Sequence, residues 1–300
     1  MNQTNVYDVV IVGAGPAGLQ AAIHAARKKV SVMVLGKDHK SSLFKAHVEN
    51  LCCLFNATGK SMLETGRRQA ANFGTRFMDA DILKITARDD CYVLDTESGE
   101  QLTCRALILA TGSARNTLRV KGEKDLLGKG VSYCVDCDGN FYRGEEVAVV
   151  GDESAAVDGA LTLAEIAGSV HLICNDLNVS EALLKKIDDS RVVVHRGRKL
   201  KEIAGENQVD GLVLDDGTTL SATGVFIELG AKGLMELATS LGVALDDEMR
   251  FIRTDKAQRT SVPGIFAAGD ICGPPWQVAK AVGEGCVAGL EAAAYAKAQK

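Results

Sequence analysis

The sequence predicts an α/β protein with two Rossmann-like dinucleotide-binding domains of three ββα layers, the second inserted into the first. The first observation behind this prediction is a strand-like run that enters a glycine-rich turn and continues into a helix of small residues. The second observation is a repeat of the same pattern later in the chain. Strand, helix and following strand lie at 7–12, 16–28 and 30–35, and again at 146–150, 155–167 and 170–173. Strand–helix–strand units of this length are typical of parallel sheets.

Two later strand-like runs indicate how the two units are connected. The run 106–112 leaves the first unit, whereas 264–270 follows long after the second unit has ended and leads into a helix at about 277–297. Both runs end in a glycine turn, so insertion of the second unit into the first is the economical topology. The expected domains are residues 1–114 with 246–300, and residues 115–245.

Composition excludes several classes of function. The 300 residues carry a formal net charge of −5, which argues against a basic surface for nucleic acid. No uninterrupted apolar run reaches the roughly 18 residues of a membrane span, and residues 1–7 lack the features of a secretory signal. The nine cysteines are odd in number and scattered, unlike a secreted disulfide framework. We therefore expect a cytoplasmic protein without a nucleic-acid or membrane partner.

The first glycine-rich turn, residues 13–18, fits the G-x-G-x-x-G pattern after a strand and at the start of a helix. Gly13 permits the tight turn, Gly15 lets a pyrophosphate approach the backbone, and Gly18 lets helix and strand pack closely. The helix start adds unpaired N–H groups and a partial positive charge. The residues expected to bind the dinucleotide here are Gly13, Gly15, Pro16, Ala17 and Gly18.

The second half of the site separates FAD from NAD. The runs Ala110-Thr111-Gly112 and Ala268-Gly269-Asp270 resemble the distal signatures of flavoproteins with two dinucleotide domains. In that superfamily the acid at the place of Asp270 contacts the ribityl–phosphate region of the flavin, so the resemblance implies FAD; a helix cap is the alternative. An acid for the adenosine ribose is expected near position 35, where only the less suitable Asp38 follows. The further expected cofactor contacts are Asn50, Thr111, Gly112, Gly269, Gln277 and Val278.

A C-x-x-C pair, Cys134 and Cys137, carries the redox chemistry that we expect. Cysteines at this spacing can close a small disulfide, and thiolates in such motifs often have lowered pKa values. A zinc site would need a second C-x-x-C or a histidine pair at suitable spacing, and none follows, so we expect no metal. Two inert core cysteines remain the other alternative.

The order of these motifs resembles the low-molecular-weight thioredoxin reductases over nearly the whole chain. The most specific part is C-x-x-C-D-G at 134–139, directly before the second unit. The resemblance implies an FAD-dependent, homodimeric enzyme that reduces thioredoxin or a thioredoxin-like protein. It also implies that Cys137 faces the flavin, that Cys134 attacks the partner disulfide, and that Asp138 acts as acid and base; a turn residue is the alternative for Asp138.

The second glycine loop departs from the family pattern. Asp152 and Glu153 stand where family members that bind NADPH have glycines, and their charges would repel a pyrophosphate. After the next strand, residues 174–176 supply no cation for a 2′-phosphate, while the Arg-containing run 195–198 falls in a later strand-like segment. We therefore expect another electron donor, ferredoxin or a deazaflavin. NAD(P)H bound through atypical contacts is the alternative.

Two smaller features and one other class of function stay open. Cys52 and Cys53 could form a second redox relay, although packing in the core is the favoured interpretation. Trp276 could stack on the flavin, shape a docking surface or pack in a core. A flavin-binding redox sensor, whose disulfide regulates docking rather than turnover, is the alternative from outside the enzymes.

Overall fold

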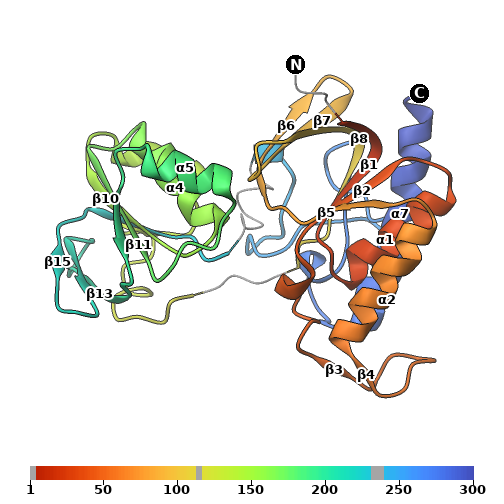
Figure 1. Cartoon of the computed structure of the whole chain (residues 1–300), viewed down its shortest axis with the longest axis horizontal. Coiled ribbons are helices and arrows are strands. Elements are labelled where there is room, and N and C mark those ends of the chain that lie inside the picture. Colours follow the sequence, from red (N-terminus) through yellow and green to blue (C-terminus); the bar gives the residue numbers. More distant parts are fainter. Residues whose placement is uncertain (1–4, 113–116, 231–239) are drawn as a thin grey trace. The chain divides into compact units, whose positions relative to one another are not determined.

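A computed structural model of the chain describes residues 5–112, 117–230 and 240–300 (Figure 1). The chain divides into two compact units, each described by itself below. The first unit comprises Met1–Thr96, Glu100–Ala114 and Leu237–Lys300, and the second comprises Glu97–Gly99 and Arg115–Glu236. The second unit is thus inserted into the first, as the sequence predicts.

The second boundary, at 236/237, differs from the expected 245/246. The reason is that Ala244 and Leu245 pair with residues that follow them in the chain. Leu245 forms a β-bridge with Ile252, the N–H of Arg253 donates to Ala244 O at 3.1 Å, and the N–H of Ala244 donates to Ser261 Oγ at 2.8 Å. These bonds attach the segment to the carboxyl-terminal part of the first unit. The expected boundary at 114/115 lies outside the described residues.

The first unit is built on a seven-stranded sheet of order β5-β2-β1-β8-β7-β6, with β17 also paired to β8. Its strands are β1 (Asn5–Val12), β2 (Val32–Leu35), β5 (Arg76–Met78), β6 (Ile82–Arg88), β7 (Cys91–Thr96), β8 (Gln101–Leu109) and β17 (Ile265–Ala267). The strands β5, β2, β1, β8 and β17 run parallel, and β6, β7 and β8 pair antiparallel. A short hairpin of β3 (His47–Val48) and β4 (Ala57–Thr58) stands apart from this sheet.

The helices of the first unit are α1 (Pro16–Arg27), α2 (Gly59–Asn72) and α7 (Val278–Ala298), with short 3-10 turns η1 (Asp38–Lys40) and η3 (Asp270–Cys272). Helices α1 and α7 pack together through alanine-rich faces in one core. Their approach depends on glycine: a Cβ on Gly285 would lie 2.2 Å from Ala17 O, and one on Gly289 would lie 2.3 Å from Ala21 O. The final helix is therefore held against the first one.

The second unit has a five-stranded parallel sheet of order β12-β11-β10-β16-β9 and a three-stranded antiparallel sheet of order β13-β14-β15. Its strands are β9 (Val131–Ser132), β10 (Glu146–Val150), β11 (Ser169–Cys174), β12 (Val193–Arg196), β13 (Leu200–Ala204), β14 (Gly211–Leu214), β15 (Thr219–Leu220) and β16 (Gly224–Ile227). Its helices are α3 (Val135–Asp138), η2 (Gly139–Tyr142), α4 (Ser154–Ala164) and α5 (Glu181–Asp188).

The two sheets of the second unit share an apolar core. Ala148, Val150 and Ile173 from the parallel sheet pack with Ile203 and Leu212 from the antiparallel sheet. Two sheets and a helical layer give the ββα arrangement that the sequence predicts. Among the described residues, no helix is long and apolar enough to cross a membrane.

Candidate functional site

The predicted dinucleotide loops meet at one edge of the first sheet. In the parallel register, Leu109 of β8 lies beside Val12 of β1 on one side and Ala267 of β17 on the other. The carboxyl ends of these three strands therefore lie together, which is where ligands bind in open α/β sheets. The loops that leave this edge are residues 13–15, 110–112 and 268–270. The structure thus brings together segments that are remote in sequence.

The loop between β1 and α1 has the shape that a pyrophosphate needs. Gly13 has φ +119° and a Cβ there would lie 2.2 Å from Ala110 O, while a Cβ on Gly18 would lie 1.9 Å from Gly13 O. In contrast, a Cβ on Gly15 would meet only Ser41 Oγ, at 3.4 Å. Gly13 and Gly18 therefore serve the fold, and Gly15 leaves room beside the helix start. Pro16 opens α1, and no side chain caps the helix, so these residues fit an anionic diphosphate.

The turn that carries Asp270 is held from α7 by two side chains that the sequence analysis missed. Lys280 Nζ donates to Gly269 O at 2.8 Å and to Gly273 O at 2.6 Å. Glu284 Oε2 accepts the N–H of Gly269 at 2.8 Å and pairs with Lys280 at 3.1 Å. We call Lys280 and Glu284 the turn clamp. In the sequence, only the (i, i+4) spacing of these two residues indicates that they pair. Such pairs are common on helix surfaces, so the spacing does not predict a role in holding the turn.

Asp270 lies in a partly buried position between charged groups. Burial raises the pKa of its carboxyl above the usual range, Lys280 opposes that rise, and Glu284 adds to it. The raised pKa means that the ionised carboxylate is stabilised less here than in water. A hydrogen-bond donor on a bound ligand, such as the hydroxyls of a ribityl chain, would stabilise the carboxylate. The position of Asp270 therefore fits the predicted flavin contact.

The remaining predicted cofactor residues lie in the same unit. Asn50 Nδ2 donates to Gln277 Oε1 at 2.8 Å, Gln277 is the N-cap of α7, and Val278 packs near the cluster of Leu19, Leu43, Val48 and Leu63. Ala17 is buried, and a Cβ on Gly269 would lie 2.9 Å from its Cβ. Thr111 is exposed, and Gly112 has φ +80° with open space around it.

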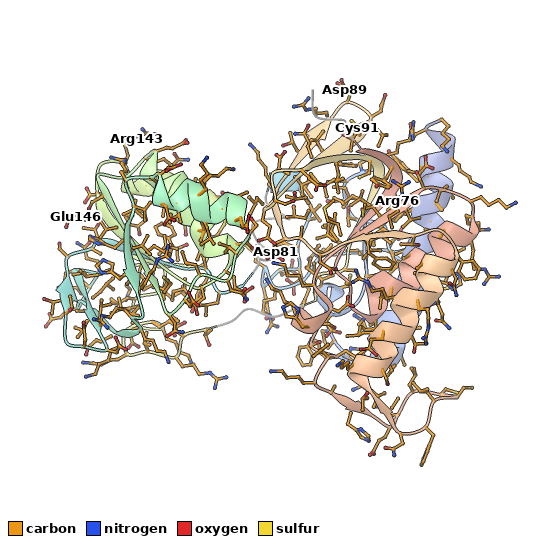
Figure 2. The ribbon with its side chains drawn as sticks, viewed as in Figure 1. Arg76, Asp81, Asp89, Cys91, Arg143 and Glu146 are labelled. Atoms are coloured by element: carbon orange, nitrogen blue, oxygen red, sulfur yellow. A yellow bond between two sulfur atoms is a disulfide. The ribbon has the colours of Figure 1, made fainter. Side chains whose placement is uncertain are left out.

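Asp38 has a structural partner instead of a clear place in the ribose site. Its Oδ1 accepts from Arg67 Nη1 at 2.9 Å, and Arg67 also pairs with Asp79 at 2.8 Å. Nearby, Lys37 and Lys40 pair with a buried carboxylate, at 3.3 Å and 2.9 Å. This carboxylate belongs to Asp81, which is labelled in Figure 2. This network gives the acid at position 38 a structural role in the first unit.

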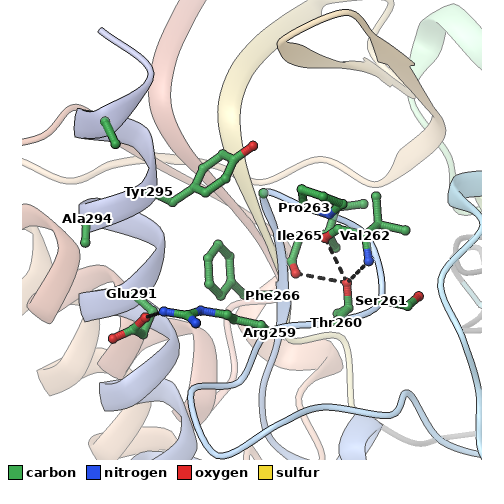
Figure 3. A pocket seen from close by; sticks show the side chains of 12 residues that line it. Arg259, Thr260, Ser261, Val262, Pro263, Ile265, Phe266, Glu291, Ala294 and Tyr295 are labelled. Carbon is green, nitrogen blue, oxygen red and sulfur yellow. Dashed lines mark hydrogen bonds and ion pairs between the residues drawn. The ribbon is translucent and has the colours of Figure 1, made fainter.

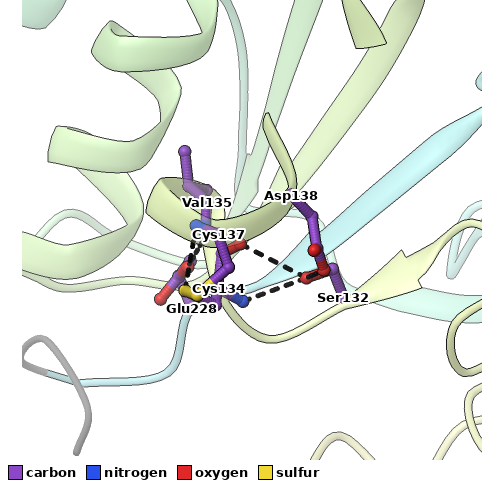
Figure 4. Close-up of a disulfide and its surroundings, with 6 residues drawn as sticks. All are labelled: Ser132, Cys134, Val135, Cys137, Asp138 and Glu228. Atoms are coloured by element: carbon purple, nitrogen blue, oxygen red, sulfur yellow. Dashed lines mark hydrogen bonds between the residues drawn. A yellow bond between two sulfur atoms is a disulfide. The ribbon is translucent and has the colours of Figure 1, made fainter. Parts of the chain in front are cut away.

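The redox pair is a disulfide in the second unit. Cys134 and Cys137 are bonded, with Cα atoms 5.3 Å apart. Cys134 caps the short helix α3, and its Sγ accepts the N–H of Cys137 at 3.1 Å (Figure 4). Cys134 is buried and Cys137 is half-buried. In a zinc site or a pair of inert thiols, the two alternatives for this motif, the sulfurs would not be bonded to each other. The disulfide therefore matches neither alternative.

Carboxylates surround the disulfide on two sides. Ser132 Oγ donates to Asp138 Oδ2 at 2.7 Å and accepts the N–H of Cys134 at 3.1 Å. The buried Glu228, which the sequence analysis missed, accepts the N–H of Val135 at 3.1 Å (Figure 4). Glu228 directly follows β16, and only the parallel sheet brings this strand beside β9 and the disulfide segment. Asp138 is therefore linked to Cys134 through a hydroxyl.

The second glycine-type loop is occupied by its own side chains. Gly151 keeps the tight turn, since a Cβ there would lie 2.0 Å from Glu228 O. Asp152 Oδ1 accepts the N–H of Asn175 at 2.7 Å, and the N-cap of α4 is Glu153. Asp152 thus bridges to the loop after β11. Burial and the nearby Asp152 raise the pKa of the Cys174 thiol to about 11. The thiol therefore stays neutral, and a cysteine offers no positive charge that could bind a phosphate.

The run 195–198 belongs to the edge strand and its end, as predicted. His195 lies on β12 with its Nε2 3.0 Å from Nδ1 of His171. Arg196 pairs with Asp188 at 3.0 Å and Arg198 with Asp216 at 2.8 Å. These cations therefore have carboxylate partners of their own.

The other open features lie on the surface. Trp276 is 61% exposed, so it does not pack in the core of its unit. Cys52 and Cys53 are both exposed, and the favoured interpretation of core packing is wrong. Among the described residues, no group of three potential ligands could hold a metal.

A cavity of about 550 Å³ lies elsewhere on the first unit (Figure 3). Its walls include Pro263, Phe266 and Tyr295, and Arg259 pairs with Glu291 beside it. It opens near the amino end of β17, whereas the predicted dinucleotide loops follow the carboxyl end. The cavity is therefore separate from the candidate site.

Comparisons with known proteins agree with this arrangement. Residues 7–285 match the family described as pyridine nucleotide-disulphide oxidoreductase. The chain is 32% identical to the thioredoxin reductase of Escherichia coli O157:H7, with 98% of each chain covered. It is 32% identical to the bifunctional thioredoxin reductase/thioredoxin of Mycobacterium leprae, spanning 96% of this chain and 65% of that protein.

Two solved structures are similar over nearly their whole length. The atypical thioredoxin reductase TRi from Desulfovibrio vulgaris Hildenborough superposes with a TM-score of 0.87 at 36% identity, covering 97% of this chain and 98% of that one. A ferredoxin-flavin thioredoxin reductase from Clostridium acetobutylicum gives a TM-score of 0.71 at 30% identity, with 97% and 98% covered.

Proposed function

Because the chain belongs to the pyridine nucleotide-disulphide oxidoreductase family, and within it to the low-molecular-weight thioredoxin reductases, we propose that it reduces the disulfide of thioredoxin or a thioredoxin-like protein. It is an FAD-dependent oxidoreductase. The observation that carries the proposal is the Cys134–Cys137 disulfide, whose segment is hydrogen-bonded to Asp138 and Glu228. The relative from Mycobacterium leprae, a bifunctional thioredoxin reductase/thioredoxin, supports a thioredoxin-type partner.

The chain's own residues explain how the disulfide can turn over. Bound FAD would supply the electron pair that the disulfide needs. The N–H of Cys137 donates to Cys134 Sγ, and this bond favours a thiolate there once the disulfide is open. Cys134 would then attack the partner disulfide, and Cys137 would resolve the mixed disulfide by attacking Cys134. Asp138 would hold the proton that the departing partner thiolate takes up.

We propose that ordinary NADPH is not the electron donor. Asp152 and Glu153 place carboxylates at the start of α4, and the cations Arg196 and Arg198 are paired elsewhere. The similarity to the ferredoxin-flavin thioredoxin reductase from Clostridium acetobutylicum supports ferredoxin, and a deazaflavin is the other candidate. NAD(P)H bound by atypical contacts remains the competing proposal, supported by the dinucleotide-type fold of the second unit.

Anaerobic titration of the purified flavoprotein tests the donor. NADPH, NADH, reduced ferredoxin and a reduced deazaflavin would each be added while the flavin absorbance is followed. We expect bleaching by ferredoxin or the deazaflavin at stoichiometric amounts and none by the nicotinamides. Prompt bleaching by NADPH would favour the competing proposal.

Variants of the redox pair test the reaction itself. Cys134→Ser should keep its flavin and lose all reduction of thioredoxin, because the mixed disulfide cannot form. Cys91→Ser, in strand β7 (Figure 2), is the matched control and should retain turnover. Retained turnover in Cys134→Ser would show that the redox pair is not the route. Loss of thioredoxin reduction in both variants would point to a general effect of removing a thiol.

The assembly and the compartment follow from the same proposal. We propose a homodimer in the cytoplasm, where thioredoxin-type partners are kept reduced. Light scattering of the purified protein at several concentrations checks the dimer. A monomer at every concentration would contradict it.

A further inference from the structure

Cys52 and Cys53 form a pair of neighbouring thiols in the β3–β4 hairpin of the first unit. Both side chains are exposed, and their Sγ atoms lie 3.6 Å apart. Cys53 has φ +67°, in the left-handed region that residues other than glycine seldom adopt. The N–H of Leu54 donates to Leu51 O at 3.0 Å and closes the turn around the pair. The two sulfurs are therefore presented together on a tight turn.

The spacing of these two residues disfavours a disulfide. Neighbouring Cα atoms across a trans peptide lie about 3.8 Å apart, whereas bonded cysteines usually have Cα atoms roughly 4.4–6.8 Å apart. Cys134 and Cys137, at 5.3 Å, fall inside that range. The same chain thus holds one cysteine pair spaced for a disulfide and one spaced too closely for an unstrained one. A strained disulfide is also the easier one to reduce.

The separation of the two sulfurs instead suits a shared ligand. An atom about 2.3 Å from each sulfur, the usual length of a metal–thiolate bond, would span the 3.6 Å separation at an S–atom–S angle of about 100°. That angle fits pyramidal or tetrahedral centres and not linear ones. No rearrangement of the turn is needed to close such a chelate.

The residues around Cys52 and Cys53 indicate which kind of atom the two thiolates could bind. Within the described ranges, no group of three His, Cys, Asp or Glu residues could hold a metal, so a centre that needs four protein ligands has no site here. A trivalent arsenic atom that carries one organic group is complete with two thiolates. The next residues in the chain, Leu54 and Phe55, are exposed at 36% and 92% and offer apolar surface for that group. We propose that Cys52 and Cys53 form a two-thiolate binding site for monosubstituted trivalent arsenicals.

The binding reaction is balanced without an oxidant. An organoarsenic oxide, R–As=O, reacts with the two thiols so that two As–S bonds form and two S–H bonds break. The oxygen leaves with both protons as water, and arsenic stays trivalent. The site is independent of thioredoxin reduction, because it uses neither the Cys134–Cys137 disulfide nor the flavin.

The test uses the holoprotein as purified, without reductant, so that Cys134 and Cys137 stay bonded. One equivalent of phenylarsine oxide is added, and unbound reagent is removed by gel filtration. Intact mass and free-thiol titration should then give one adduct and the loss of two thiols per chain, reversed by a small dithiol. Cys52→Ser and Cys53→Ser should each lose the adduct at least about tenfold, since one thiolate cannot chelate. Cys286→Ser, on α7, is the matched control and should keep it.

Three outcomes would overturn the proposal. These are no adduct on the wild-type protein, an adduct that persists in both single variants, and a Cys52–Cys53 disulfide found by peptide mapping before any reagent is added. The last outcome would identify a second redox pair instead. Flavin absorbance of each variant reports folding, so a misfolded variant is recognised. Because the readout is mass and not turnover, its failure is distinguishable from failure of the proposed enzyme activity.

Discussion

The two units of the protein have the same strand–turn–helix element but opposite chemistry at its turn. The turn glycine is kept in both, as Gly13 and Gly151, because backbone carbonyls lie where a Cβ would be. The N-cap residue differs: it is Gly15 in α1 and Glu153 in α4. The glycine that the fold requires is thus retained, while the one that we propose for phosphate binding is replaced. We therefore expect the fold and nucleotide binding to be separable at single positions.

The difference in anion binding that we expect between the starts of α1 and α4 depends on both charge and free space. A like-charge pair about 4 Å apart at an effective dielectric near 20 is repelled by about 4 kcal/mol, and solvent reduces this. Gly15 has no side chain and leaves open space beside the start of α1. The absence of a charge and the free space at this position therefore both favour a bound anion in the first unit. In the second unit, Glu153 at the equivalent position adds both a negative charge and a side chain, and each disfavours a bound anion.

The largest expected effect comes from moving the acidic N-cap into the first unit. Gly15→Glu should weaken FAD binding at least about 100-fold, because a carboxylate would occupy the space left for the pyrophosphate. The flavin-to-protein absorbance ratio after purification measures it. Gly283→Glu adds the same side chain at an exposed position of α7 with open space around it and should keep its flavin. Full occupancy in Gly15→Glu would remove the contrast between the units.

A smaller loss is expected from the turn clamp. Lys280→Met removes two charge-assisted hydrogen bonds to Gly269 O and Gly273 O, and FAD affinity should fall about tenfold, or about 1.4 kcal/mol. Fluorescence of released flavin gives the dissociation constant. Lys297→Met, in the last turn of the same helix, should leave it unchanged. An unaltered constant in Lys280→Met would mean that the turn holds its shape without the clamp.

Replacing the acidic residues of the second unit by glycine should restore part of a nucleotide site there. The double substitution of Asp152→Gly with Glu153→Gly removes two carboxylates from the start of α4, so flavin reduction by NADPH, which we expect to be absent from the wild-type protein, should become detectable. Stopped-flow absorbance at saturating NADPH measures the rate. Asp89→Gly and Asp90→Gly, in the exposed turn between β6 and β7, remove the same charge elsewhere and serve as the control. No gain would indicate that the missing cation at 174–176 is the stronger barrier.

The smallest effect concerns the acid stability of the second unit. Burial lowers the pKa of both His171 and His195 below the ordinary value of 6.5. Because the folded state favours the neutral rings, stability should fall as the pH drops below 6.5 toward the lowered pKa values. His195→Gln should lessen that fall, by roughly 2 °C in Tm at about pH 5.5. Thermal unfolding near pH 7.5, where both rings are neutral, is the internal control, and equal acid sensitivity of variant and wild type would contradict the assignment.

Local patterns in the sequence predicted the parts of the site that lie on one turn. Gly13, Gly15 and Gly18 could be assigned because their spacing within one turn is a local pattern, although the carbonyl that Gly13 must avoid, Ala110 O, is remote in the sequence. The turn clamp of Lys280 and Glu284 could not, since their partners are carbonyl and amide groups eleven and fifteen residues away in the chain. The same limit applies near 245/246, because Ala244 and Leu245 pair with residues seven to seventeen positions later in the chain.

The pairing of β17 with β8, and of α7 with α1, imposes an order of events on the ribosome. The second unit is synthesised before β17, Asp270 and α7, so it can fold while the first unit is still incomplete. Because the proposed flavin contacts at Asp270, Gln277 and Val278 lie in this late segment, we expect a nascent chain to retain flavin only after α7 has left the ribosome.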